Sequence, residues 1–299
     1  LGWRTRLELE VDDAGRPGMF RARTHDIVPV HELPLAVPAI QEAGILGLEW
    51  NPGDRLRVVA PSGEPGEAYV LSHTSPGGPR WVTERVVAAA PDDGPEPWSM
   101  TYRVQTGGFW QMHRASPAVL VTAALSGIGE AVDGDWWRRA ARPGAGRTGH
   151  VETPMTGLTV WDLYSGAGLF SVPLARLVGE SGHVEAVEAD RGGAEAARRN
   201  LAAYGWARSR RAKVEAALPA LPRPDIVLLD PPRTGAGTKV CRALADAGPR
   251  VIGYVACDPA ALARDLAVLT GAGYRIRTLR GFDLFPHTHH VECVAVLAR

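Results

Sequence analysis

Alternating polar and apolar positions run through much of the first hundred residues and predict short strands. Thr5–Val11 alternates, Asp12–Gly15 has the composition of a tight turn, and Met19–Ala22 would return as the second strand of a hairpin. This part of the chain is therefore predicted to be β-rich with mixed elements. The other elements expected here are strands over 55–59, 68–71, 81–87 and 100–105 and a helix over 37–48.

From residue 158 onward, apolar runs of strand length are separated by stretches with helical spacing. Strands that alternate with helices in this way join into a parallel sheet, so the pattern predicts an α/β fold with a doubly wound, Rossmann-like sheet. The last two strand-like segments follow one another without a helix, which predicts an antiparallel hairpin at one edge. The expected strands are 158–164, 183–188, 225–230, 251–256, 274–279 and 291–298, with helices that include 192–204 and 259–270.

A helix and a loop connect these two parts. Ser116 followed by Pro117 is typical of a helix N-terminus, with Ser116 as the cap, and predicts a helix over 117–130. Residues 133–157 are rich in Gly, Pro and Arg and read as a loop. We therefore expect a smaller β-rich domain over 1–106 and a doubly wound domain over 107–299 that contains this loop.

Composition narrows the class of protein. The sequence contains no run of about 18 apolar residues and no secretory signal, so neither a membrane span nor export is expected. Three cysteines without a C-x-x-C pair argue against a disulfide framework and indicate a cytoplasmic protein. The net charge is zero, so any basic surface for nucleic acid has to be local.

A glycine turn predicts a nucleotide-type site. The strand over 158–164 runs into Ser165-Gly166-Ala167-Gly168, and such glycines let the backbone approach a ligand at the carboxyl edge of a sheet. Glu188 ends the next strand, where a carboxylate can accept both ribose hydroxyls. A nicotinamide dehydrogenase and a purely structural turn are alternatives. Ser171 replaces the third glycine of the dinucleotide fingerprint, which favours S-adenosylmethionine over a pyrophosphate ligand.

Three further strand ends carry chemically active residues, Asp230, Cys257 and Glu292, and the topology would bring the first two to the same edge. Methylation of a pyrimidine at C5 needs a thiolate that adds to C6 and a base that removes the C5 proton, which are suitable roles for Cys257 and Glu292. Asp230 would orient the base or the cofactor, and Arg233 would hold a flipped nucleotide. The alternative for a lone cysteine is a buried small hydrophobe, the interpretation we give to Cys241 and Cys293.

Histidines near the C-terminus raise the question of a metal. His287, His289 and His290 are close in sequence, but no spaced acidic or cysteine partner accompanies them. We therefore expect no metal site.

Taken together, these motifs resemble those of the bacterial RNA 5-methyluridine methyltransferases that act on transfer or ribosomal RNA. The resemblance runs from about residue 107 to the C-terminus and implies a methyl transfer from S-adenosylmethionine to C5 of a uridine through a covalent cysteine adduct. The implied cofactor contacts are Gln111 (in Phe109-Trp110-Gln111), Tyr164, Gly166, Gly168, Glu188 and Asp230, the implied catalytic residues are Cys257, Glu292 and Asp230, and the implied substrate contacts are Arg233 and His290.

The same comparison separates related enzymes. RNA 5-methylcytosine methyltransferases usually carry a second cysteine after the fourth-strand proline, and this chain has no cysteine there. Amino-group methyltransferases favour an aromatic residue where this chain has Arg233. The alternatives that remain open are a catalytically weak or inactive RNA-binding or RNA-folding protein that keeps the cofactor fold, and an RNA 5-methylcytosine methyltransferase.

The chain departs from the family pattern at three positions. Asp258 stands where the family usually has Asn, and we expect its charge to raise the pKa of the neighbouring thiol. Leu169 stands where the family often has Asn, which puts one of the implied cofactor contacts in question. Leu33 stands at the last cysteine of an iron–sulfur motif, so we expect the cluster to be absent. The RNA-binding barrel common at the N-terminus of the family is not seen in this sequence, which leaves open whether such a domain precedes Leu1.

RNA is the expected partner, with no membrane association and a monomeric state. Aromatic and arginine side chains recognise bases and phosphates, although solvated surface charge is an equally good reading of each cluster. The candidate contacts are Trp136, Trp137, Arg138, Arg139, Arg142 and Arg147 in one cluster and Arg208, Arg210, Arg211 and Lys213 in a second.

Overall fold

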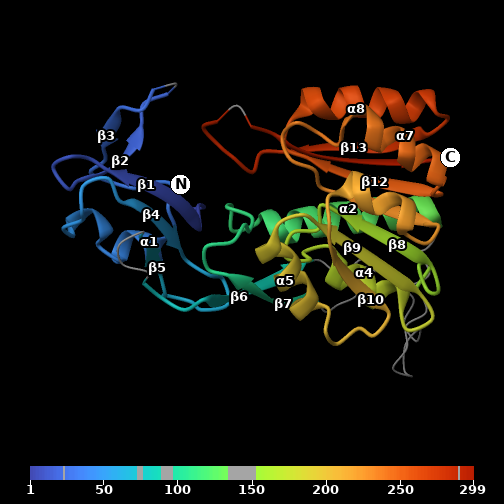
Figure 1. Ribbon diagram of the computed structural model, residues 1–299, viewed down its shortest axis with the longest axis horizontal. Coiled ribbons are helices and arrows are strands. Elements are labelled where there is room, and N and C mark those ends of the chain that lie inside the picture. The colour runs from blue at the N-terminus through green and yellow to red at the C-terminus, as the bar shows by residue number, and fades with distance from the viewer. Residues whose placement is uncertain (23, 73–76, 89–96, 134–152, 289) are drawn as a thin grey trace. The chain divides into compact units, whose positions relative to one another are not determined.

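The computed structural model describes residues 1–22, 24–72, 77–88, 97–133, 153–288 and 290–299, which divide into two units (Figure 1). Unit 1 comprises Leu1–Arg85 and Arg103–Ser116, and unit 2 comprises Val86–Tyr102 and Pro117–Arg299. The chain passes between the units within two paired strands, β6 (Trp81–Ala88) and β7 (Trp98–Gln105). Among the described residues, no helix combines the length and the apolar composition that crossing a bilayer requires.

Unit 1 is built on a five-stranded antiparallel sheet with the order β3-β2-β1-β4-β5. The alternating pattern of the first strand buries one face, on which Leu7 and Leu9 pack against Leu56 and Val58 of the neighbouring strand. The hairpin predicted from the first twenty-two residues is confirmed. The strands are β1 (Arg6–Val11), β2 (Pro17–Phe20), β3 (Ile27–Pro29), β4 (Arg55–Val59) and β5 (Tyr69–Leu71).

The helix predicted over 37–48 is wrong as one continuous element. Gly44 adopts a left-handed conformation (φ 63°) that ends α1 (Pro38–Glu42) and starts the short 3-10 helix η1 (Ile45–Gly47). The apolar spacing was nevertheless informative, because Ile40 and Ile45 are both buried in the core of unit 1.

Unit 2 contains a seven-stranded sheet with the order β10-β9-β8-β11-β12-β14-β13. All neighbouring strands from β10 to β12 are parallel, and β14 runs antiparallel to both of its neighbours. The predicted doubly wound α/β fold and its antiparallel terminal pair are confirmed. The strands are β8 (Thr159–Leu163), β9 (His183–Glu188), β10 (Ala207–Arg211), β11 (Ile226–Leu229), β12 (Val251–Ala256), β13 (Arg275–Phe282) and β14 (Glu292–Ala298).

Helices cover both faces of this sheet (Figure 1). Apolar side chains of α6, α7 and α8 form one core with it, while α2 lies on the opposite face, where Gly127 allows close approach: a Cβ there would come within 2.7 Å of Val296. Ser116 opens α2, but its hydroxyl has no hydrogen-bond partner in the described structure, so it does not act as the predicted cap. The helices are α2 (Ser116–Val132), α4 (Ser171–Val178), α5 (Arg191–Asn200), α6 (Val214–Ala217), η2 (Leu218–Ala220), α7 (Gly237–Ala247) and α8 (Pro259–Gly271).

The topology gathers many loops at one edge of the sheet. The parallel strands β8, β9, β11 and β12 all end there, and the antiparallel β14 begins there. In open α/β sheets this carboxyl edge is where ligands bind. A ligand site is therefore expected at this edge of the sheet.

Candidate active site

The turn after β8 is shaped to admit a ligand. Tyr164 (φ 61°), Gly166 (φ 52°) and Gly168 (φ 87°) all adopt left-handed conformations, which bend the backbone sharply at the sheet edge. A Cβ built on Gly166 would meet no atom within 4 Å, so open space lies beside this part of the turn. The Tyr164 ring packs against the apolar core of the sheet.

Glu188, the last residue of β9, closes one side of the turn. Its carboxylate accepts a hydrogen bond from the Gly166 amide at 2.8 Å and another from the Asp190 amide at 2.6 Å. Each carboxylate oxygen has further lone pairs, and the side chain is only half-buried. Glu188 therefore stabilises the turn and can still accept hydroxyl groups of a ligand.

Two side chains that sequence reasoning missed hold the same turn. The buried Tyr102 hydroxyl donates to the Leu169 carbonyl at 2.9 Å, and the Asn200 side-chain amide donates to the Ala167 carbonyl at 2.9 Å. Both partners are more than thirty residues away in sequence, so no local motif indicates them. The Leu169 side chain is buried.

Polar atoms lie unsatisfied beneath the turn. Asp162 in β8 is fully buried and accepts a hydrogen bond from the Ser171 hydroxyl. Burial, opposed by this hydrogen bond, raises the pKa of Asp162 to about 7. In the described structure the second Asp162 oxygen and the Ser165 hydroxyl have no hydrogen-bond partner, although buried polar atoms normally have one. These atoms fit a ligand that brings polar groups to the turn.

The three predicted catalytic residues meet at the same edge. Asp230 follows β11, Cys257 follows β12, and Glu292 opens β14. Because Ala256 pairs with Cys293 across the antiparallel strands, the Cys257 and Glu292 positions leave the sheet as neighbours. The structure thus brings together a thiol and two carboxyl groups from distant parts of the sequence.

The carboxyl groups at this edge are held partly in their neutral form. Glu292 is 5% exposed, and burial, opposed by the Arg233 guanidinium, raises its pKa to about 7. Burial, and next the neighbouring Glu292, raise the pKa of Asp230 well above its ordinary value. Two carboxylates so close to each other disfavour double ionisation. The two groups therefore disfavour being ionised together, and a carboxyl with a pKa near 7, as in Glu292, suits a general base.

The Cys257 thiol is kept protonated by the same surroundings. Burial raises its pKa, as do Glu292 and Asp230, while Arg233 lowers it. The expected rise of the Cys257 pKa is confirmed in direction, but its causes are burial, Glu292 and Asp230, and Asp258 is not among them. The Asp258 carboxylate accepts from the Ala261 amide at 2.8 Å and caps α8, where the helix dipole favours negative charge.

A buried hydrogen-bond network supports the loop that carries Arg233. Asp265, fully buried on α8, accepts from the Tyr254 hydroxyl at 2.6 Å and from the Gly237 amide at 3.0 Å. The Tyr254 hydroxyl in turn accepts from the Ala236 amide at 3.0 Å. Arg264 donates to the Thr234 carbonyl at 2.7 Å. Sequence reasoning missed this network because its members lie on separate elements.

The other predicted residues have varied placements. Gln111 is buried and belongs to unit 1, and its cofactor contact stays a prediction. His290 is half-buried with its ring edge-on to Phe285. Cys241 and Cys293 are buried, as expected of small apolar residues. No group of three metal-ligating side chains occurs among the described residues, and His289 lies outside them.

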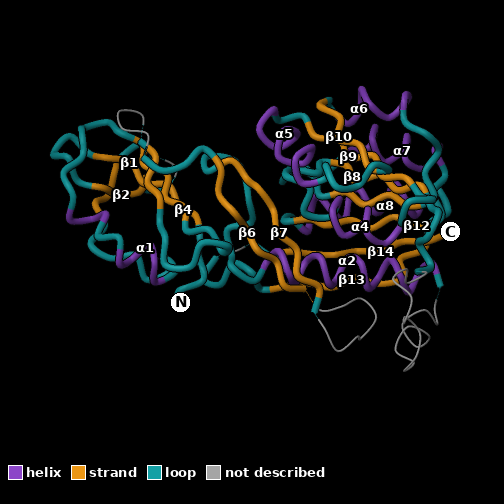
Figure 2. The backbone as a smooth tube through the Cα atoms, turned by 90° about the horizontal axis from the view of Figure 1, so that it is seen from below, coloured by secondary structure: helices purple, strands orange, loops and turns teal. Residues whose placement is uncertain are grey.

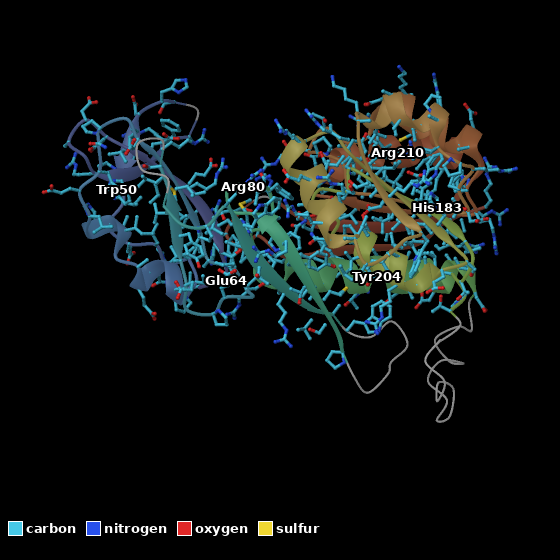
Figure 3. All side chains as sticks on the ribbon, turned by 60° about the horizontal axis from the view of Figure 1, so that its bottom comes forward. Trp50, Glu64, Arg80, His183, Tyr204 and Arg210 are labelled. Carbon is cyan, nitrogen blue, oxygen red and sulfur yellow. The ribbon has the colours of Figure 1, made fainter. Side chains whose placement is uncertain are left out.

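Of the two predicted RNA-contact clusters, the structure describes the second. The cluster from Trp136 to Arg147 lies outside the described residues. In the second cluster, Arg210 on β10 donates to Glu185 on β9 at 2.5 and 3.0 Å, and His183 contacts the same carboxylate. Figure 3 labels Arg210 and His183. Arg210 therefore forms a structural ion pair with Glu185. Arg208 and Arg211 of the same cluster are exposed.

Comparisons with known proteins agree on one family. Residues 223–299 match the model of a family described as tRNA (Uracil-5-)-methyltransferase. An uncharacterised RNA methyltransferase of Streptomyces avermitilis is 37% identical over 99% of this chain and 67% of its own length. Its counterparts in Streptomyces coelicolor (38%; 99% and 63%) and Bifidobacterium longum (34%; 100% and 67%) are similarly related. The chain thus spans about two thirds of the length of these relatives.

Among solved structures, the tRNA (uracil-54, C5)-methyltransferase of Pyrococcus abyssi in complex with S-adenosyl-L-homocysteine has a similar fold. The match has a TM-score of 0.67 at 23% identity and covers 99% of this chain and 76% of the other. At this identity the likeness shows a shared fold.

Proposed function

Since the chain belongs to the RNA (uracil-5-)-methyltransferase family, we propose that it methylates C5 of a uridine in tRNA or rRNA with S-adenosylmethionine as methyl donor. One observation carries the proposal: the Cys257 thiol and the Glu292 carboxyl, whose pKa is about 7, lie side by side at the sheet edge that also bears the glycine turn. A thiol and a base are the two groups that C5 methylation of a pyrimidine requires.

The turn after β8 fits this methyl donor. Glu188 would accept the ribose hydroxyls, the open space at Gly166 would admit the ligand beside the backbone, and the unsatisfied Asp162 and Ser165 oxygens would meet its polar groups. When bound, S-adenosylmethionine supplies an electrophilic sulfonium methyl group. Gln111 and Asp230 remain proposed contacts of the same ligand.

The residues of the chain then act on the uridine in order. The Cys257 thiolate bonds to C6, which moves the electron pair of the C5–C6 double bond toward C5 and O4. C5 takes the methyl group, and the electron pair of the broken bond stays on the donor's sulfur, giving S-adenosylhomocysteine. Glu292 removes the C5 proton, and the electron pair it leaves restores the double bond as the thiolate departs. Arg233, which is exposed, would hold the flipped nucleotide over the site.

The proposal is tested by incubating the protein with S-adenosylmethionine and unmodified RNA tritiated at uridine C5. Release of tritium into water is the expected result, since the C5 proton is lost in every turnover. Failure to release tritium, with RNA still bound, would support the rival of a non-catalytic RNA-binding protein.

Replacing Glu188 by Gln should weaken S-adenosylhomocysteine binding by about 10- to 100-fold, because a hydrogen bond to a charged acceptor is worth roughly 1.5–3 kcal/mol. Isothermal titration calorimetry measures the dissociation constant. Glu180→Gln is the matched control, since Glu180 is an exposed carboxylate on the same unit and its replacement should leave affinity unchanged. Equal affinity of the Glu188 variant and the native protein would remove Glu188 from the site.

The rate of C5 proton release should rise between about pH 6 and pH 8. Glu292 accepts a proton only when ionised, so below its pKa of about 7 the rate should fall about tenfold for each pH unit. The raised pKa of Cys257 extends the rise into the alkaline range, because the thiolate fraction keeps growing there. Single-turnover tritium release measured across this range checks the profile, and a flat rate from pH 6 to pH 8 would contradict it.

A further inference from the structure

A groove that the catalytic steps leave unused runs between α2 and β13 on one face of the unit 2 sheet. Its volume is about 420 Å³, within the range of small-molecule sites. Figure 2 shows α2 alongside β13 and β14. The lining residues are Ala118, Val119, Thr122 and Ala123 of α2 and Arg280 and Phe282 of β13.

The groove ends beside the proposed proton acceptor. Residues directly opposite in an antiparallel pair point to the same face of a sheet, and Phe282 of β13 lies opposite Glu292 of β14. The face is the one that α2 covers, because a Cβ on Gly127 would come within 3.2 Å of Thr278 and 2.7 Å of Val296, which lie four residues along their strands from Phe282 and Glu292. An occupant of the groove would therefore lie next to the nucleotide being methylated.

The groove also carries positive charge. β13 is the edge strand of the sheet and contains Arg275, Arg277 and Arg280, all exposed, and no acidic residue. None of the three forms an ion pair within the described part of the chain. The Arg280 guanidinium lies over the Phe282 ring, 5.1 Å from its centroid. Asp283, which is exposed, is the one acidic residue next to the strand in sequence, and Glu292 opposite Phe282 is buried.

We propose that this groove binds an RNA nucleotide that flanks the target uridine. Its base stacks on Phe282 over the small apolar side chains of α2, and the Arg280 guanidinium meets its phosphate, while Arg277 and Arg275 continue the phosphate track along the strand. An aromatic ring beside arginines is the combination that binds single-stranded nucleic acid. The inference rests on the proposed function, since it names how the same site holds its RNA.

Two variants test the groove by different means. Arg280→Ala removes the phosphate contact, and Thr122→Phe fills the space without changing any charge. Each should raise the KM for unmodified RNA about tenfold and leave both kcat and S-adenosylhomocysteine affinity unchanged. Arg280→Ala alone should also reduce the slope of log KM against log salt by about one, as expected for one lost phosphate contact. Arg242→Ala is the matched control, because Arg242 is exposed on α7, across the sheet from the groove.

A direct binding measurement separates this proposal from the proposed function. Fluorescence anisotropy of a labelled oligouridylate of about ten nucleotides needs no turnover. If the native protein releases no tritium yet binds the oligonucleotide through Arg280, the proposed function fails and the groove stands. Variants that bind and methylate RNA like the native protein overturn the groove. The proposal is also overturned if the variants change the sedimentation of the protein and leave its RNA affinity unchanged. The edge strand β13 would then govern pairing with a second copy of the chain, either by forming that contact or by preventing it through its arginines.

Discussion

Replacing Cys257 by Ala should abolish uridine methylation and leave cofactor binding intact. Without the thiolate, C5 of uridine is too weak a nucleophile, so tritium release should fall by at least about 10⁴-fold. The fold should tolerate the change, since Cys257 is half-buried at a strand end and packs outside the main core. A second readout is covalent capture: RNA containing 5-fluorouridine should form an adduct with the native protein that survives a denaturing gel, and none with the variant.

Cys293→Ala is the control for this experiment. Cys293 lies next to Glu292 and pairs with Ala256, so it is as close to the site in the sheet as a second cysteine can be. It is 8% exposed and belongs to the apolar core, and its variant should keep both activity and adduct formation. Adduct formation by the Cys257 variant, or its loss in the Cys293 variant, would mean that the nucleophile has been wrongly assigned.

Replacing Glu292 by Gln should stop the reaction after the covalent adduct has formed. Glutamine is nearly the same size but accepts no proton, so the C5 proton stays and the thiolate cannot leave. Tritium release should fall by about 10²- to 10⁴-fold, while a covalent complex with ordinary uridine RNA accumulates. Denaturing gels measure the complex. Asp283→Asn is the control, since Asp283 is an exposed carboxylate directly after β13 and its variant should turn over normally. No complex with the Glu292 variant would argue against this role.

The same Glu292 variant should be more stable than the native protein at about pH 8. The pKa of Glu292 rises from an ordinary 4.5 to about 7 on folding, so the folded state binds this proton more tightly. Its contribution to stability is complete below pH 4.5 and is lost as the pH rises toward 7, a cost of up to about 3 kcal/mol above that. Glutamine avoids this cost. Thermal unfolding should show the gain at pH 8 and no gain at pH 4.5, which distinguishes lost catalysis from lost folding.

The sequence was most informative where a local pattern decides the structure. The parallel strands β8, β9, β11 and β12 are mostly buried on both faces, and their ends were predicted to within a few residues. Because parallel strands share one edge, the same pattern was enough to bring Asp230 and Cys257 together. The proximity of Cys257 to Glu292 was harder to predict from the sequence, since it depends on the place of β14 within the sheet.

Contacts between residues far apart in the chain, and backbone conformations at single residues, could not be predicted from the sequence. Tyr102 reaches the glycine turn from another strand. The hydrogen bonds between Asp265 and Tyr254 join two elements and support the loop that carries Arg233. The break at Gly44 divides a stretch whose apolar spacing suits one helix. Asp258 was interpreted from its position next to Cys257 in the sequence, but its side chain caps the helix that follows. The roles assigned to the site residues and the domain boundary at 106 stay predictions.

The position of β14 has a consequence for the order of folding. This strand is synthesised after every other strand of its sheet, yet it lies between β12 and β13. Residues far apart in sequence must therefore meet before the sheet is complete, and such topologies fold slowly. An intermediate in which β14 has not yet inserted would already contain the glycine turn and Cys257 but not Glu292. In the proposed mechanism such a molecule would hold the cysteine that captures RNA without the base that releases it, so catalytic turnover would depend on the insertion of this one strand.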